Sequence, residues 1–217
     1  MALAFGKAKG KAETSRVKTL DYKDGENAVR LFGGVLARYV YWLKGKNNKD
    51  IPVECLAFNR EDERFDNAVE DPVPDFYPDK KCSWSYVING INLATGEEVA
   101  VNLKKKLFQQ IVETAESLGD PTDPDDGWDI VFKRVKTGAH AFNVEYNLMP
   151  LKCKKRPLTE AERAVVAAAK SIDEKYPRPT PEDIRKLLTK IQTTGSEEEE
   201  GGEDGDAAAG EAARELG

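Results

Sequence analysis

The chain is 217 residues long, with 40% hydrophobic and 33% charged residues, which suits one compact domain with appendages rather than two large domains. No apolar run approaches the roughly 20 residues of a membrane helix, and lysines follow residues 3–5 at once, so we expect neither a membrane span nor a signal peptide. The single histidine, His140, excludes most hydrolase designs that rely on a Ser-His or Cys-His pair. Three widely spaced cysteines, Cys55, Cys82 and Cys153, predict reduced thiols in a cytoplasmic protein.

The two ends of the chain carry opposite charge. Residues 196–217 hold nine acidic residues and one arginine, so this segment more than accounts for the net charge of −6, and residues 1–195 are left mildly basic at +2. Because the segment has too few apolar residues to form a core, we expect a disordered acidic interaction tail. Residues 1–23 contain six lysines and arginines against two acidic residues. This is typical either of a fraying terminus or of a basic arm that contacts phosphate or a neighbouring protomer.

The first half of the chain is rich in β-branched and aromatic residues. Residues 28–43 predict two short strands, or one strand with a bulge at the Gly33-Gly34 pair. A turn over residues 44–50 leads to a further strand from Ile51 to Phe58. Residues 59–81 are polar and contain three prolines, which predicts a long loop of the kind that often carries function.

A hairpin and a helix follow this loop. Apolar residues alternate over residues 84–88 and again over residues 99–103, and a turn at residues 93–97 separates them. From Leu107 onward, apolar residues recur at helical spacing, which predicts an amphipathic helix of about 14 residues that ends at Gly119.

The remaining elements complete a strand-helix-strand order. After a loop over residues 120–127, residues 128–135 and 141–149 are expected to be strands. We therefore predict a mainly β fold with accessory helices, namely a five-stranded Greek-key barrel of the OB type. Beyond it, Thr159 and Glu162 form a capping box for a helix that runs to about Lys175, residues 176–179 break that helix, and Thr180 starts a second one. The expected units are an arm (1–23), a barrel (24–156), a helical extension (157–195) and a tail (196–217).

Sites for catalysis or for a cofactor are not evident in the sequence. It has neither a phosphate-binding loop nor a dinucleotide fingerprint, and we expect a protein that is not an enzyme and that needs no cofactor. The acidic loop 120–126 lacks the spacing of a calcium-binding loop, and the cysteines lack the close pairs of a structural zinc site, so a metal site is not expected.

Aromatic and basic residues share the predicted strands and loops, and single-stranded nucleic acid needs both, because rings stack on bases and cations neutralise phosphates. For any one ring, burial in the core is the competing interpretation. The candidate rings are Tyr39, Tyr41, Trp42, Phe76, Tyr77, Trp84, Tyr86, Phe142 and Tyr146. The candidate cations are Arg30, Arg38, Lys44, Lys46, Lys80, Lys81, Lys104, Lys105, Lys106, Lys133 and Arg134.

A run of motifs between residues 105 and 151 resembles the single-stranded DNA-binding (helix-destabilising) proteins of tailed bacteriophages, especially those of myoviruses and cyanophages. The motifs are KKLFQQI (105–111), GDPTDPDDGWDI (119–130), FKR (132–134), Gly138 and FNVEY (142–146). Together they cover roughly a fifth to a quarter of the chain, and the order of basic arm, barrel and acidic tail adds to the resemblance.

The resemblance implies an OB-fold that binds single-stranded DNA without sequence preference during phage replication, recombination and repair in the infected host cell. It implies that Phe142 and Tyr146 face the DNA, with Lys133 and Arg134 near phosphates. The arm, with Lys7, Lys9 and Lys11, would support cooperative self-association, and the acidic tail would recruit replication or recombination proteins and compete with DNA. The zinc subdomain of some relatives has no counterpart in this sequence.

Two other functions fit the same pattern of residues. The barrel could be a platform for protein interactions, with the acidic tail as its working part. It could also be an RNA-binding OB domain of the cold-shock type.

Overall fold

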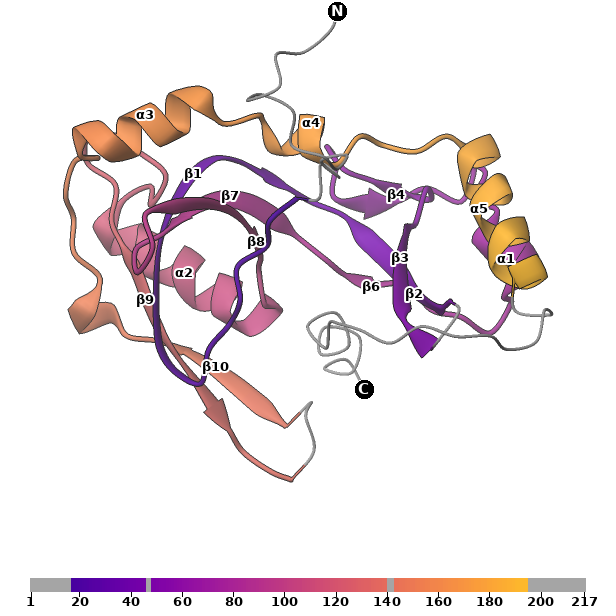
Figure 1. Cartoon of the computed structure of the whole chain (residues 1–217), viewed down its shortest axis with the longest axis horizontal. Helices are drawn as coiled ribbons and strands as arrows, with labels where there is room; N and C mark the ends of the chain where they lie inside the picture. Colours follow the sequence, from indigo (N-terminus) through magenta and orange to yellow (C-terminus); the bar gives the residue numbers. More distant parts are fainter. Residues whose placement is uncertain (1–16, 46–47, 140–142, 195–217) are drawn as a thin grey trace, which may run out of the picture.

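The computed structural model describes residues 17–45, 48–139 and 143–194, and in this part of the chain strands predominate (Figure 1). The main sheet is antiparallel and five-stranded, in the order β10-β9-β1-β7-β8. Its strands are β1 (Gly25–Leu36), β7 (Val87–Asn92), β8 (Glu97–Asn102), β9 (Ile130–Lys136) and β10 (Val144–Leu148). The prediction of a mainly β fold with accessory helices is confirmed at this level.

Strand β1 is long and bulged. Its register against β7 shifts between Phe32 and Val35, where Gly33 has a φ of +74° that favours glycine. The bulge expected at the Gly33-Gly34 pair is therefore present, and a separate strand, β2 (Tyr39–Lys44), follows it.

The main sheet and helix α2 (Lys105–Leu118), which together we call the body, enclose one part of the principal core, and the rest of this core lies among residues 37–86 and 184–191. One face of the sheet contributes Val29, Leu31, Val99 and Phe132, which alternate with residues of the opposite face. Helix α2 packs against β10 and buries Leu107 and Ile111. As predicted, it ends at Gly119, which has a φ of +82° and whose N–H bonds to the Ala115 carbonyl over 2.8 Å.

Residues 37–86, which follow β1 and precede β7 in the chain, form a second layer of structure that we call the insert. It contains a three-stranded sheet in the order β3-β2-β6, a two-stranded hairpin of β4 and β5, and one short helix. These elements are β3 (Asp50–Glu54), β4 (Phe58–Asn59), β5 (Arg64–Phe65), α1 (Val73–Phe76) and β6 (Ser83–Trp84). The strand expected over residues 51–58 is shorter in the structure. Strand β3 ends at Glu54, and Phe58 pairs with Phe65 in a separate hairpin. The loop expected over residues 59–81 is likewise not structureless, since it contains β5 and α1.

Two chain segments connect the insert to the body, and they run side by side. Arg38 lies on the segment between β1 and β2, and Ser85 lies on the segment between β6 and β7. The Ser85 N–H donates to the Arg38 carbonyl over 2.9 Å, and the Arg38 side chain donates to the Ser85 carbonyl over 3.2 Å. The two segments therefore form a hydrogen-bonded ribbon, and buried side chains of the insert and the body also belong to one continuous core.

The C-terminal elements run from the body to the insert, across the top of Figure 1. After a 3₁₀ turn (Pro150–Lys152) come α3 (Glu160–Ala168), α4 (Ile172–Lys175) and α5 (Pro181–Thr194). The capping box of Thr159 and Glu162 is present as predicted. A single helix to Lys175 was wrong, because Ala169 is extended and Ser171 starts a new helix by accepting a bond from the Glu174 N–H.

The N-terminal segment joins the body before β1 begins. Ala100 of β8 accepts a bond from the Leu20 N–H over 2.9 Å and donates to the Lys18 carbonyl over 2.8 Å, and Leu20 is buried. The last residues of the arm expected over 1–23 thus belong to the folded body. Residues 1–16 and the tail 196–217 lie outside the described residues. Among the helices that the structure describes, none is long and apolar enough to cross a membrane.

Candidate nucleic-acid interface

Six aromatic rings form two groups of three, one within the insert and one where the insert meets the body, and Tyr39 of the first group pairs with Trp84 of the second in the β2–β6 ladder; together we call them the aromatic strip. Its members are Tyr39, Phe58, Phe65, Trp84, Tyr86 and Phe108. At the insert end, the Tyr39 ring centroid lies 4.6 Å from that of Phe58 and 5.0 Å from that of Phe65. Tyr39 is also the cross-strand partner of Trp84 in the ladder between β2 and β6.

Trp84 lies where the insert meets the body. Its ring stacks on Tyr86 with centroids 4.4 Å apart and planes 17° from parallel. Phe108, on α2 of the body, lies 5.9 Å from Trp84 and 6.0 Å from Tyr86. The strip therefore depends on residues from both parts of the molecule.

The rings of the strip differ in exposure. Phe65 is 51% exposed, an unusual position for a large apolar ring, while Phe58 and Tyr86 are buried beneath the surface. Tyr39, Trp84 and Phe108 are half-buried. Buried rings thus hold partly open rings in place, an arrangement that suits stacking with a flat ligand.

Exposed lysines flank the strip at two places. Lys80 and Lys81 precede Trp84 by three or four residues and are exposed. Lys105 and Lys106 are also exposed and lie in the first turn of α2; Lys105 is three residues before Phe108 and so neighbours it on the helix surface, whereas Lys106 is two residues before it and does not. The dipole of α2 favours an anion at this end of the helix, and no acidic side chain of the first turn already occupies that position.

An acidic side chain also contacts the strip. The pKa of Tyr86 is raised to about 12 by burial and by the neighbouring carboxylate of Glu63, to which its hydroxyl bonds. Tyr86 is therefore protonated at neutral pH and serves as a donor. On the same hairpin, Arg64 has a largely exposed side chain and lies 3.2 Å from Asp62.

A second group of rings lies in the body and is more enclosed. Tyr22, Phe132 and Tyr146 contact one another, with the Lys104 ammonium 5.3 Å from the Tyr146 ring centroid. Tyr146 is only 6% exposed, and Arg134 is buried beside Asp24. Both residues were expected at the DNA surface, but in this structure they belong to the interior. Lys133, next to Arg134 on β9 and paired with Asn147 of β10, is exposed on the other face of β9.

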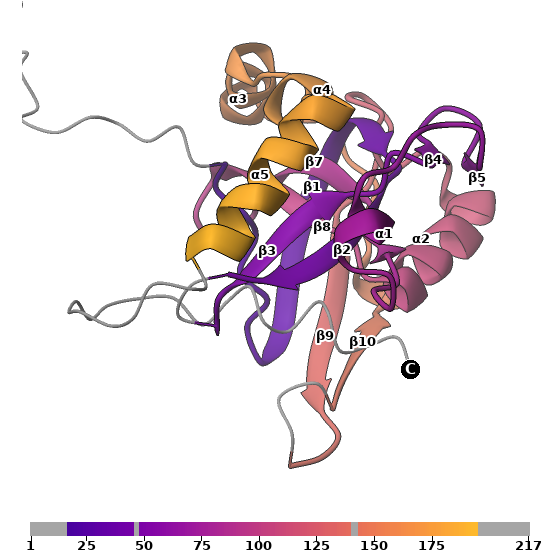
Figure 2. The ribbon, with the colours of Figure 1, turned by 90° about the vertical axis from the view of Figure 1, so that its right-hand side faces the viewer.

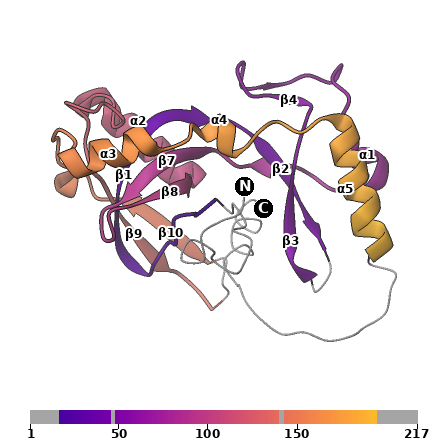
Figure 3. The same ribbon diagram turned by 45° about the horizontal axis from the view of Figure 1, so that its top comes forward.

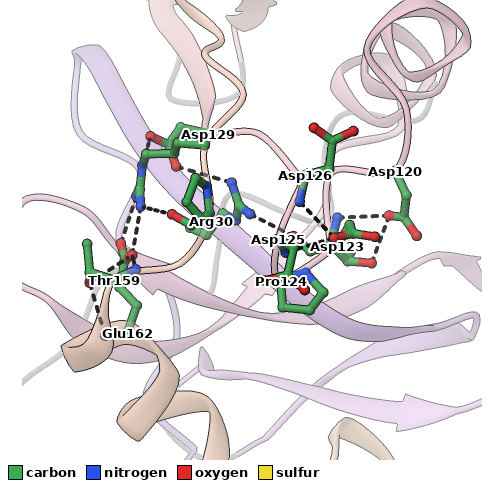
Figure 4. A network of polar contacts seen from close by, with 12 residues as sticks. Arg30, Asp120, Asp123, Pro124, Asp125, Asp126, Asp129, Thr159 and Glu162 are labelled. Atoms are coloured by element: carbon green, nitrogen blue, oxygen red, sulfur yellow. Dashed lines mark hydrogen bonds and ion pairs between the residues drawn. The ribbon is translucent and has the colours of Figure 1, made fainter.

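Arg30 was expected to contact phosphate, and the structure places it in the interior with 0% exposure (Figure 4). Its guanidinium donates to the Asp123 carbonyl over 2.7 Å and lies 3.7 Å from the Asp129 carboxylate. Arg156 joins Asp129 to Glu162 at the start of α3, with both contacts at 2.7 Å. Arg30 thus connects β1 to the acidic loop and is not available to a ligand at the surface.

The same network explains the GDPTDPDDGW motif structurally. A Cβ atom at Gly127 would lie 2.3 Å from the Asp123 carbonyl oxygen and 2.7 Å from Arg30, so no larger residue fits there. Trp128 is fully buried and donates to the Gly119 carbonyl over 2.9 Å. The carboxylates of Asp125 and Asp126 bond to Arg163 and Lys155. In the part of the chain that the structure describes, no group of three or more Cys, His, Asp or Glu residues could hold a metal ion.

The other candidates from the sequence are dispersed. Tyr41 is buried, with its hydroxyl 3.0 Å from Asp71, and the indole N–H of Trp42 bonds to Ser83 over 3.1 Å. Lys44 pairs with Asp50, and Arg38 covers the ring of Tyr176. Phe76 and Tyr77 pack against the core of the molecule. Lys46, Phe142 and His140 lie outside the described residues.

Sequence reasoning missed Phe58, Phe65, Arg64 and Phe108. Phe108 lies in an amphipathic pattern, where an aromatic residue is most simply assigned to the core. Phe65 lies in a segment whose composition is typical of a loop, and its pairing with Phe58 is not visible in the sequence. The one available signal was an aromatic residue next to an arginine in an otherwise polar stretch.

Comparison with known proteins gives one informative match. No family model matches the chain. Over 73 residues the chain is 41% identical to a protein of Escherichia phage T5 that carries the name "Probable ssDNA-binding protein". The matched stretch makes up 34% of this chain and 28% of the relative, so the chain matches well under half of that protein. The resemblance to phage single-stranded DNA-binding proteins is thereby confirmed.

Proposed function

We propose that this protein binds single-stranded DNA without sequence preference, with bases on the aromatic strip and phosphates on the flanking lysines. The observation that carries the proposal is the strip itself, in which partly exposed rings lie within a few residues of exposed lysines in the chain. The proposed contacts are Tyr39, Phe65, Trp84, Phe108, Lys80, Lys81, Lys105 and Lys106. The name of the T5 relative agrees with this ligand.

We further propose that the body is a barrel of the OB type. Two observations support it: β1, β7 and β8 form an antiparallel meander followed by α2, and β9 then pairs with the far side of β1 before β10 pairs with β9. In this fold, the loop between the first two strands contributes to binding of oligonucleotides. The insert occupies that loop, and the strip begins in it.

The preference for unpaired DNA has a physical reason. In a duplex each base is held stacked between its neighbours, so its ring faces are not available to the strip, whereas a flexible single strand can present them. The proposed role is that of a non-enzymatic protein that coats and protects single strands during phage replication, recombination and repair in the infected host cell. We also propose that the acidic tail recruits partner proteins and competes with DNA, and that the basic arm supports self-association.

The test is a titration of labelled oligo-dT, followed by fluorescence anisotropy at several salt concentrations. We expect affinity for single strands to exceed affinity for a matched duplex and to fall with salt, with a slope of about −0.7 for each phosphate neutralised. Lys105→Ala should reduce the size of that slope by about 0.7. Lys186→Ala, which removes an exposed lysine of α5, is the matched control and should leave the slope unchanged.

Three outcomes would contradict the proposal. Absence of binding to oligo-dT at low salt would favour a platform for protein interactions. Stronger binding to a matched RNA than to DNA would favour the RNA-binding alternative. Equal affinity for single-stranded and duplex DNA would show that stacking on the strip is not used.

A further inference from the structure

The C-terminal segment from α4 to the start of α5 (residues 172–181), which we call the strap, is a third crossing between the body and the insert. The other two crossings run side by side at Arg38 and Ser85, and a ribbon of two adjacent segments can bend as a hinge. The strap crosses separately, as Figures 1 and 3 show, with α4 over β7 and β8 and α5 beyond the insert sheet.

On the body, the strap is fixed by an apolar contact and by polar contacts. Ile172 is buried against Leu36, Val87 and Ala100. Lys175 donates to the side chain of Asn89 over 2.6 Å and pairs with Glu98. The body end of the strap is therefore anchored to the outer face of β7 and β8.

On the insert, the strap is fixed mainly by arginines. Arg178 donates to the carbonyl oxygens of Leu56 and Phe58 over 2.7 and 3.0 Å, and Phe58 is a member of the aromatic strip. Arg60, which binds Glu54 through two bonds, also donates to the Tyr176 carbonyl over 3.1 Å. Beyond the strap, α5 packs against α1 (Figure 2). Ile184 and Leu188 of α5 are buried.

The strap also reaches the hinge itself. The Arg38 guanidinium lies 4.4 Å from the centroid of the Tyr176 ring, so a side chain of the connecting ribbon is held by the strap. A swing of the insert away from the body would break this contact and the Arg178 bonds together.

We infer that Arg178 and Tyr176 are positioning residues that hold the insert at one distance from the body, so that the two halves of the aromatic strip form one binding surface. The inference rests on the proposed function, because it concerns the same site. Neither residue belongs to the proposed DNA contacts. They affect binding indirectly, because they set the distance between Tyr39 and Phe65 in the insert and Phe108 in the body.

The inference predicts an effect that depends on the length of the DNA. A short oligo-dT of about 4 nucleotides can use one half of the strip, whereas one of about 16 nucleotides must use both halves. Arg178→Ala should weaken binding of the long oligonucleotide at least about fivefold, the lower end of typical coupling between sites, and leave the short one unchanged. Arg185→Ala, on α5 with an exposed ion pair to Glu70, is the matched control and should change neither.

The fold should survive this change, because Arg178 is a surface residue. Arg178→Lys keeps the charge with a different donor geometry and should give a smaller loss with the long oligonucleotide, which provides a second readout if the alanine variant is unstable. Equal affinities of wild type and Arg178→Ala for both lengths, or equal losses at both lengths, would overturn the inference. A wild-type protein that binds neither oligonucleotide would instead refute the proposed function.

Discussion

The two aromatic groups of this protein both contain tyrosine and phenylalanine rings but differ in what surrounds them. Tyr22, Phe132 and Tyr146 lie on the body, where Phe132 is 1% and Tyr146 6% exposed. The aromatic strip lies at the junction with the insert, and its rings range from buried Phe58 to half-exposed Phe65. Both groups have cations nearby. Aromatic rings are thus more open to a ligand in the strip than in the enclosed group of the body.

The largest expected effect concerns the enclosed group. Phe132→Ala should lower the free energy of unfolding by about 3–5 kcal/mol, because it removes a fully buried ring from the core. Measured by urea denaturation, this loss should come without a change in oligo-dT affinity per folded molecule. A Phe132→Ala variant with normal stability and weakened binding would show that DNA binds at the enclosed group rather than at the strip.

The next effect concerns the strip. Trp84→Leu should weaken binding of oligo-dT by about 1–3 kcal/mol, roughly 5- to 150-fold, through the loss of base stacking. Trp42→Leu is the matched control, since Trp42 lies in β2, outside the strip, and binds Ser83. Anisotropy titrations of both variants measure the difference. If the two substitutions weaken binding equally, the strip has no special role.

Much of the body could be predicted from the sequence, because the patterns that indicate its elements involve residues close together in the chain. The Gly33-Gly34 bulge, the turn at residues 93–97 and the end of α2 at Gly119 each depend on residues close together in the chain. The break between α3 and α4 at Ala169 was missed because no glycine or proline marks it, and the cap at Ser171 starts the new helix.

The site was less predictable, because it depends on contacts between distant residues. Tyr39, Trp84 and the lysines were identified as candidates from their residue types. That they lie near Phe65 and Phe108 depends on how the insert packs on the body, which the sequence does not show. Arg30 looked like a phosphate ligand because its partner, the Asp123 carbonyl, is 93 residues away in the chain. A charged residue on a strand therefore says little about the surface until its partners are known.

The smallest effect concerns the polar network that joins the acidic loop to α3. Hydrogen bonds from Arg156 lower the pKa of Glu162 from 4.5 to about 2. Because the folded pKa lies below the unfolded value, this carboxylate stabilises the fold above about pH 4.5 and loses its contribution as the pH falls toward 2. Glu162→Gln should therefore flatten the acid limb of thermal stability, whereas Glu160→Gln, an exposed residue of the same turn, should not. Parallel acid limbs for both variants and wild type would show that the ion pair contributes nothing.

The central claim, that bases stack on the aromatic strip, is tested most directly by photo-crosslinking. Oligonucleotides containing bromodeoxyuridine would be irradiated in complex with the full-length protein, and the cross-linked residues mapped by mass spectrometry. We predict cross-links at Tyr39, Phe65, Trp84 and Phe108. Cross-links confined to other aromatic residues, with none in these four, would contradict the account.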